Sequence, residues 1–127
     1  MRFVDLPHAI YNDASVSASR RRRLSIQAYD YVDIWVQVVA LNGSPTLASF
    51  DVRLEHKIPR EGGQWLDAGG KSISPVTEAS PLPSTQVISL APADVKSEDI
   101  SLAIDVTFAG GVSPSWSVNL YYQGRAS

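Results

Sequence analysis

The segment ISLAIDVTF, residues 100–108, decides the fold class because it carries the most regular alternation of apolar and polar side chains in the chain. Ile100, Leu102 and Ile104 occupy every second position, and Val106 and Phe108 continue the series. Successive side chains of a β-strand point to opposite faces. The spacing therefore predicts a strand that lays one face on an apolar core and turns the other to water.

The same period of two recurs along most of the chain. It covers residues 24–28, 32–38, 50–55 and 116–122, with shorter apolar stretches at 64–69 and 87–90. Turns rich in Gly, Pro and Ser separate these segments. Only 92–100 has the composition of a helical turn, and it is too short and polar to form a layer of the fold. The sequence predicts an all-β protein, an antiparallel β-sandwich of the jelly-roll or immunoglobulin-like type.

The first 23 residues differ from the rest in both pattern and charge. They show no sustained period, and they hold five basic and two acidic side chains, against six basic and eleven acidic ones in the remaining 104 residues. We therefore expect an extended N-terminal arm over residues 1–23 and a β-sandwich domain over residues 24–127. The charge of this arm comes mostly from four consecutive arginines, Arg20, Arg21, Arg22 and Arg23.

Three interpretations of the arginine run are open: a solvated patch, a nucleic-acid contact and a segment that docks on another protein. Nucleic-acid binding needs cations spread over a face, and half of four adjacent side chains point away from any one surface when the segment is extended. Docking on an acidic protein surface is favoured, since arginine pairs bidentately with carboxylates. We expect no direct nucleic-acid partner.

Aromatic side chains provide a second set of candidate contacts. Trp116 and Tyr122 fall on the apolar phase of the last strand, which predicts that they belong to the core. Trp35 and Tyr121 fall on the opposite phase of their strands and are expected to be exposed. Exposed aromatic side chains are typical of protein interfaces, so Arg20–Arg23, Trp35 and Tyr121 are the predicted partner-binding residues. A carbohydrate platform that uses Trp35, Trp65 or Tyr121 is the alternative.

The residues needed for catalysis or metal binding do not occur in recognisable patterns. Cysteine is absent, and His8 and His56 stand 48 positions apart with no ligand motif near either. No nucleophile motif and no glycine-rich phosphate loop is present. We expect no enzyme activity, no catalytic residue, no cofactor and no metal. No apolar run approaches the roughly 20 residues of a membrane span. The first residues also lack a secretory signal, so we expect neither a membrane association nor export by that route.

Two segments of the chain echo one another. VVALNGSPTLASFDVRLEHK at 38–57 and VTFAGGVSPSWSVNLYYQGR at 106–125 both read strand, Gly, Ser-Pro, strand. Glycine takes the positive φ of a tight turn, and proline fixes the entry to the next strand. We interpret the echo as two similar hairpins with shared turn chemistry rather than as a duplication.

Turn motifs recur between residues 31 and 125: Gly43, Ser44, Pro45 and Thr46; Gly62, Gly63 and Trp65; Ser113, Pro114 and Ser115; and Gly124 and Arg125. With these motifs, this part of the chain resembles small accessory structural proteins of tailed bacteriophages. The resemblance implies a non-enzymatic virion protein, made in the host cytoplasm and bound to the capsid exterior as a decoration or cement protein. It also implies the major capsid protein as partner and a homo-oligomer, with a trimer favoured. A tail, neck or head-fibre module, or a carbohydrate-binding one, is the alternative.

Overall fold

The computed structural model describes residues 2–3, 8–24, 31–57, 64–94 and 100–126. Its elements are β1 (Arg2–Phe3), β2 (His8–Val16), β3 (Arg20–Leu24), β4 (Tyr31–Asn42), β5 (Leu47–Lys57), β6 (Trp65–Ser72), β7 (Val76–Thr77), β8 (Ser84–Leu90), the 3₁₀-helix η1 (Pro92–Asp94), β9 (Ile100–Ala109) and β10 (Ser115–Ala126). The predicted Gly62–Gly63 turn lies outside the described residues. No α-helix occurs in these ranges, which confirms the all-β prediction.

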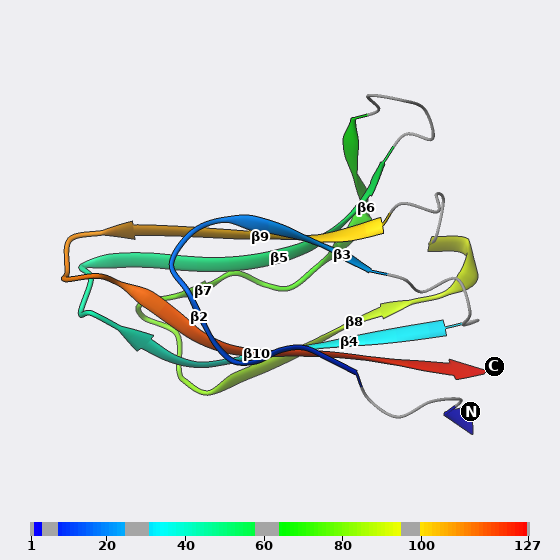
Figure 1. The fold of residues 1–127 in the computed structure, drawn as a ribbon, viewed down its shortest axis with the longest axis horizontal. Helices are drawn as coiled ribbons and strands as arrows, with labels where there is room; N and C mark the ends of the chain where they lie inside the picture. Colours follow the sequence, from blue (N-terminus) through cyan, green and yellow to red (C-terminus); the bar gives the residue numbers. More distant parts are fainter. Residues whose placement is uncertain (1, 4–7, 25–30, 58–63, 95–99, 127) are drawn as a thin grey trace.

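The strands form two antiparallel sheets that pack face to face (Figure 1). Sheet A has the order β1-β10-β4-β8, with β2 also paired to β10, and sheet B has the order β3-β9-β5-β6, with β7 paired to β5. The predicted antiparallel β-sandwich is confirmed. Both ends of the chain lie at the same end of sheet A, because β1 pairs with the last residues of β10.

The strand order distinguishes the two sandwich types that the sequence left open. Among the eight longer described strands, β2 pairs with β10, β3 with β9, β4 with β8 and β5 with β6. The first strand therefore pairs with the last, the second with the last but one, and so on inward. This is the order of one long antiparallel ribbon that is rolled over on itself, which is the jelly-roll arrangement.

The core lies between the two sheets and includes a cluster of aromatic rings near the start of β10. Trp116 of β10 is fully buried and meets Phe50 of β5 edge to face, with 6.2 Å between ring centroids. Its indole Nε1 donates a hydrogen bond of 3.0 Å to the carbonyl oxygen of Ser49, so burial leaves no indole donor unpaired. Each fully buried large apolar side chain of this kind contributes about 1.5–3 kcal/mol. Tyr122 packs against this core, so both aromatic core predictions are confirmed.

The expected N-terminal arm is corrected by the structure between residues 8 and 24. These residues form β2 at one edge of sheet A and β3 at one edge of sheet B, and Val16 at the end of β2 is fully buried. The segment is therefore part of the sandwich, and the boundary expected between residues 23 and 24 falls inside β3.

Irregular pairing explains why no period was visible in β2. Its register against β10 shifts twice, between the partners of Val118 and Leu120 and between those of Leu120 and Tyr121. Asp13 has a φ of 52° at the first shift, and its backbone N–H donates a 2.7 Å hydrogen bond to Asn119 Oδ1. Each bulge adds a residue and reverses the faces of those that follow. Apolar side chains therefore reach the core without a spacing of two.

In each of the two echoing segments, the turn joins a strand of one sheet to a strand of the other. The hairpins expected from the sequence do not form there. β4 and β10 belong to sheet A, and β5 and β9 belong to sheet B, so each turn crosses the sandwich at the same end (Figure 1). The turns pack together through a 2.9 Å hydrogen bond from the Val112 N–H to the Gly43 carbonyl. A Cβ on Gly43 would lie 2.4 Å from the Val112 carbonyl oxygen, and one on Gly111 would lie 2.6 Å from the Gly43 carbonyl oxygen. Close approach of two backbones therefore requires glycine in both turns.

Candidate interaction surfaces

The arginine run occupies an edge strand, and strand alternation divides it into two pairs. In the register of β3 on β9, Arg20 and Arg22 lie opposite the core residues Ile104 and Leu102. These two arginines therefore lie on the core-side rim of sheet B, and Arg21 and Arg23 lie on its outer face. The expectation that half of the run points away from any one surface is confirmed. We name Arg20–Arg23 the arginine edge.

Arg21 belongs to a charge network on the outer face of sheet B. Its Nε and Nη2 donate hydrogen bonds of 3.0 and 2.7 Å to Oε1 of Glu55, a residue that is only 6% exposed. Arg53 Nη2 lies 3.6 Å from the other Glu55 oxygen, and Arg53 Nη1 pairs with Asp105. Two guanidinium groups thus compensate the buried Glu55 carboxylate, as a buried charge requires.

Trp65, the first residue of β6, lies next to this network. The Arg21 guanidinium lies 4.9 Å from the Trp65 ring centroid, and that of Arg23 lies 5.5 Å from it. Arginine stacks on aromatic faces through cation–π attraction. Trp65, a predicted sugar-stacking candidate, is therefore engaged by two arginines of its own chain.

The other two arginines have different surroundings. Arg20 reaches across to sheet A, where its guanidinium lies 4.6 Å from the ring centroid of Tyr11 in β2. The side chain of Arg22 is exposed and makes no hydrogen bond, ion pair or ring contact within the described part of the chain. Arg22 is thus the member of the arginine edge whose charge is most available to another molecule.

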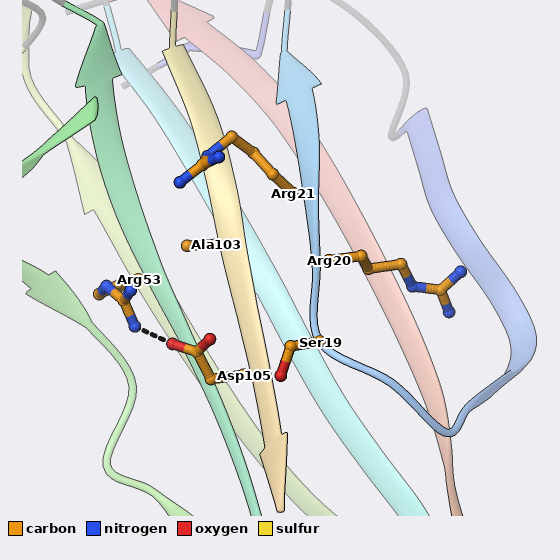
Figure 2. Close-up of a pocket in the computed structure, with 6 residues that line it drawn as sticks. All are labelled: Ser19, Arg20, Arg21, Arg53, Ala103 and Asp105. Carbon is orange, nitrogen blue, oxygen red and sulfur yellow. Dashed lines mark hydrogen bonds and ion pairs between the residues drawn. The ribbon is translucent and has the colours of Figure 1, made fainter. Parts of the chain in front are cut away.

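An open cavity of about 230 Å³ lies beside the start of β3. Figure 2 shows its lining residues: Ser19, Arg20, Arg21, Arg53, Ala103 and Asp105. Arg21 extends across β9 toward the side where Arg53 meets Asp105, and Arg20 points the opposite way (Figure 2). Arg21 and Arg53, which line the cavity on the outer face, both have carboxylate partners, so the cavity is not a free anion site.

The predicted exposed aromatic residues lie side by side on the outer face of sheet A. Tyr121 of β10 is the cross-strand partner of Trp35 in β4, and Trp35 is the partner of Val87 in β8. Trp35 is 46% exposed and Val87 is 45% exposed, and Tyr121 is partly exposed. Together these three side chains form an apolar strip across three strands, which we name the aromatic row. The predicted exposure of Trp35 is confirmed, and that of Tyr121 is confirmed in part.

Hydrogen-bonded polar pairs border the aromatic row on both sides. Asn119 Nδ2 donates to Gln37 Oε1 at 3.0 Å on one side, and Ser89 Oγ donates to Asp33 Oδ1 at 2.8 Å on the other. The Tyr121 hydroxyl donates a 3.3 Å hydrogen bond to Asn12 Oδ1. An apolar strip with a polar rim is the usual anatomy of a protein interface.

Several residues of these surfaces were not singled out from the sequence. The exposure of Val87 could have been predicted from the sequence, because Val87 and the buried Ile88 are adjacent in one strand and so point to opposite faces. Glu55, Arg53 and Tyr11 gave no local signal, because their partners lie on other strands and depend on the register between them.

Comparisons with models of protein families, with curated proteins and with solved structures found no match for this chain. Within the described ranges, no group of three or more His, Asp or Glu side chains is placed to hold a metal ion. The same ranges include no helix with the length and apolar character of a membrane span.

Proposed function

We propose that this protein is a non-enzymatic virion structural protein of the capsid decoration type, which binds the major capsid protein on the outside of the shell. The aromatic row carries the proposal. Trp35 and Val87 are cross-strand partners on adjacent strands of sheet A, and each exposes nearly half of its surface. Exposed contiguous apolar surface of this kind usually marks a site of protein association.

Two further features support a binding role. The sandwich is small and its core is tightly closed, so its faces are available as rigid contact surfaces with little ordering cost on binding. Double-sheet jelly rolls are used in viral capsid domains and in lectins. A protein that binds many equivalent positions on one shell needs only a modest affinity at each when neighbouring copies also contact one another.

Co-sedimentation tests the proposal directly. Purified protein is mixed with capsids that lack it, and the full chain is compared with Trp35→Ser and with Leu47→Ser. Leu47 is the matched control, since it is 61% exposed but lies on β5 of the other sheet. We expect the full chain and L47S to sediment with the capsids and W35S to remain in solution. Failure of all three to sediment would overturn the capsid role.

The same proposal includes a homo-oligomer, with a trimer expected. The aromatic row and the arginine edge lie on different sheets, so each chain offers more than one surface for contacts with other chains. Sedimentation velocity should give a mass three times that of the 13.8 kDa chain. A monomer at concentrations at which capsids are saturated would contradict the trimer.

Carbohydrate binding is the second candidate, and one observation favours it. Trp35 and Tyr121 lie between the Gln37–Asn119 and Asp33–Ser89 pairs, so aromatic faces and hydrogen-bonding groups occur together on one sheet face. Sugars are recognised by stacking of this kind. A glycan array would reveal binding that W35S abolishes, whereas an array without hits would leave the capsid role as the proposal.

A further inference from the structure

β3 is an edge strand with one side of its backbone open. It pairs with β9 on one side, and no other described strand pairs with it. Alternate residues of a strand direct their N–H and C=O groups to opposite sides in the plane of the sheet, so about half of these groups in β3 point away from β9. Such an edge is a template for a further strand.

The edge is held in place at both ends. At its start, Ser19 Oγ accepts a 3.0 Å hydrogen bond from the Val106 N–H and donates one of 3.3 Å to the Val106 carbonyl. At its end, Leu24 is buried opposite Ile100. A strand that is already ordered in this way loses little entropy when a partner pairs with it.

The charge of the arginine edge determines which strand it accepts. Arg20 and Arg22 project on one side of sheet B and Arg21 and Arg23 on the other, so an added strand meets cations on both of its faces. A second copy of β3 would place arginine opposite arginine, and like charges across a strand pair are destabilising. Charged residues on edge strands prevent self-pairing for this reason. An acidic strand would place carboxylates opposite these arginines, and the cross-strand interactions between charges would then be attractive.

We propose that β3 binds an extended acidic segment of another protein by strand addition, with Arg22 as the main contact for its carboxylates. Arg21 is held by Glu55 and Arg20 stacks on Tyr11, whereas Arg22 has no interaction to give up within the described part of the chain. This inference rests on the proposed function in one respect, since it names the chemistry by which a capsid subunit would be recognised.

The test uses peptides and needs no capsid. A fluorescein-labelled heptapeptide, Glu-Thr-Glu-Val-Glu-Thr-Glu, is titrated with the full chain and its anisotropy is measured. The same peptide with every backbone nitrogen methylated keeps the carboxylates but cannot donate hydrogen bonds to the edge. A peptide with Lys in place of Glu reverses the charge. We expect the first peptide to bind, the methylated one to bind at least about tenfold more weakly, and the Lys peptide not to bind.

Two charge variants test whether the acidic peptide binds at β3. Arg22→Glu should weaken binding of the acidic peptide at least about tenfold and leave the melting temperature unchanged. Lys71→Glu changes the net charge equally at the opposite edge strand β6 and should bind like the full chain. Equal binding of the methylated peptide would overturn the inference even if R22E fails to fold, as would tighter binding of a twelve-residue oligothymidine. Capsid binding without peptide binding would overturn strand addition and leave the proposed function intact.

Discussion

Arg21 Nη2 lies 2.7 Å from Oε1 of Glu55, which joins an edge strand to the centre of the same sheet across β9. The Arg21 side chain is 41% exposed and that of Glu55 is 8% exposed, so the arginine also covers the carboxylate from water. This contact shows that part of the arginine run serves the fold.

Arg21→Ala should therefore destabilise the protein by about 1–2 kcal/mol, because it leaves a buried carboxylate with Arg53 as its remaining cation in the network. Urea unfolding measures the loss. Arg22→Ala is the matched control on the same strand and should change the free energy of unfolding by less than about 0.5 kcal/mol. Equal effects of the two substitutions would mean that the Arg21–Glu55 pair contributes nothing.

Deletion of residues 1–23 should prevent folding. It removes β2, Val16 of the core and nearly all of β3, which leaves both β9 and β10 without a partner on one side. Total stabilities of small domains are only about 5–15 kcal/mol, so the loss of a core residue and of both strand pairings is expected to exceed what the remaining chain can offset. Circular dichroism on heating should show no cooperative transition. Deletion of residues 1–7, which removes β1 among the described strands, should keep one. A cooperative transition in both would support a separate arm.

Ser101→Ala should stabilise the protein by about 1 kcal/mol. Ser101 is fully buried, and its hydroxyl has no hydrogen-bond partner within the described residues. Removal of an unpaired buried hydroxyl restores the free energy that its desolvation cost. Ser49→Ala is the contrasting variant, since the Ser49 hydroxyl bonds to Thr107 Oγ1 at 2.6 Å, and it should lower the stability. The free energy of unfolding of both variants is measured in a chemical denaturant. A loss of stability in S101A as large as that in S49A would contradict this interpretation.

The stability of the protein should include an acid-sensitive contribution from Glu78. A hydrogen bond of 3.0 Å from the Ala48 N–H to Glu78 Oε2 holds the pKa of this carboxyl below its ordinary value. A group whose pKa is lower in the folded state stabilises the fold above its unfolded pKa, about 4.3 for Glu, and loses that effect as the pH falls through the folded value. Glu78→Gln should therefore be less stable than the parent chain at pH 7, with a difference that narrows toward pH 3. A difference that stays constant across this range would show that the charge of Glu78 is not involved.

The sequence predicted those parts of the fold in which strands are regular. The alternation from Ile100 to Phe108 defined β9, and the opposite phases of Trp35 and Trp116 separated an exposed ring from a buried one. β2 escaped the same reasoning because its two register shifts destroy the period, and β3 escaped it because an edge strand need not be apolar on either face.

The contacts of the candidate surfaces depended on information that no local pattern holds. Trp35 and Tyr121 are 86 positions apart and became neighbours only through the register of β4 on β10. The Arg21–Glu55 pair likewise requires β3 and β5 to flank the same strand. Pattern analysis identified exposed side chains in isolation, and topology determined which of them form one surface.

Amide hydrogen exchange at residues 20–24, followed by nuclear magnetic resonance, tests most directly whether the arginine run is a strand of the sandwich. We predict slow exchange at alternate amides, those that donate to β9, and faster exchange at the amides between them, which face the open edge. Exchange of all five amides at the rate of an unstructured peptide would contradict the account, because it would place the four arginines in a free arm and remove the edge on which their partner is proposed to bind.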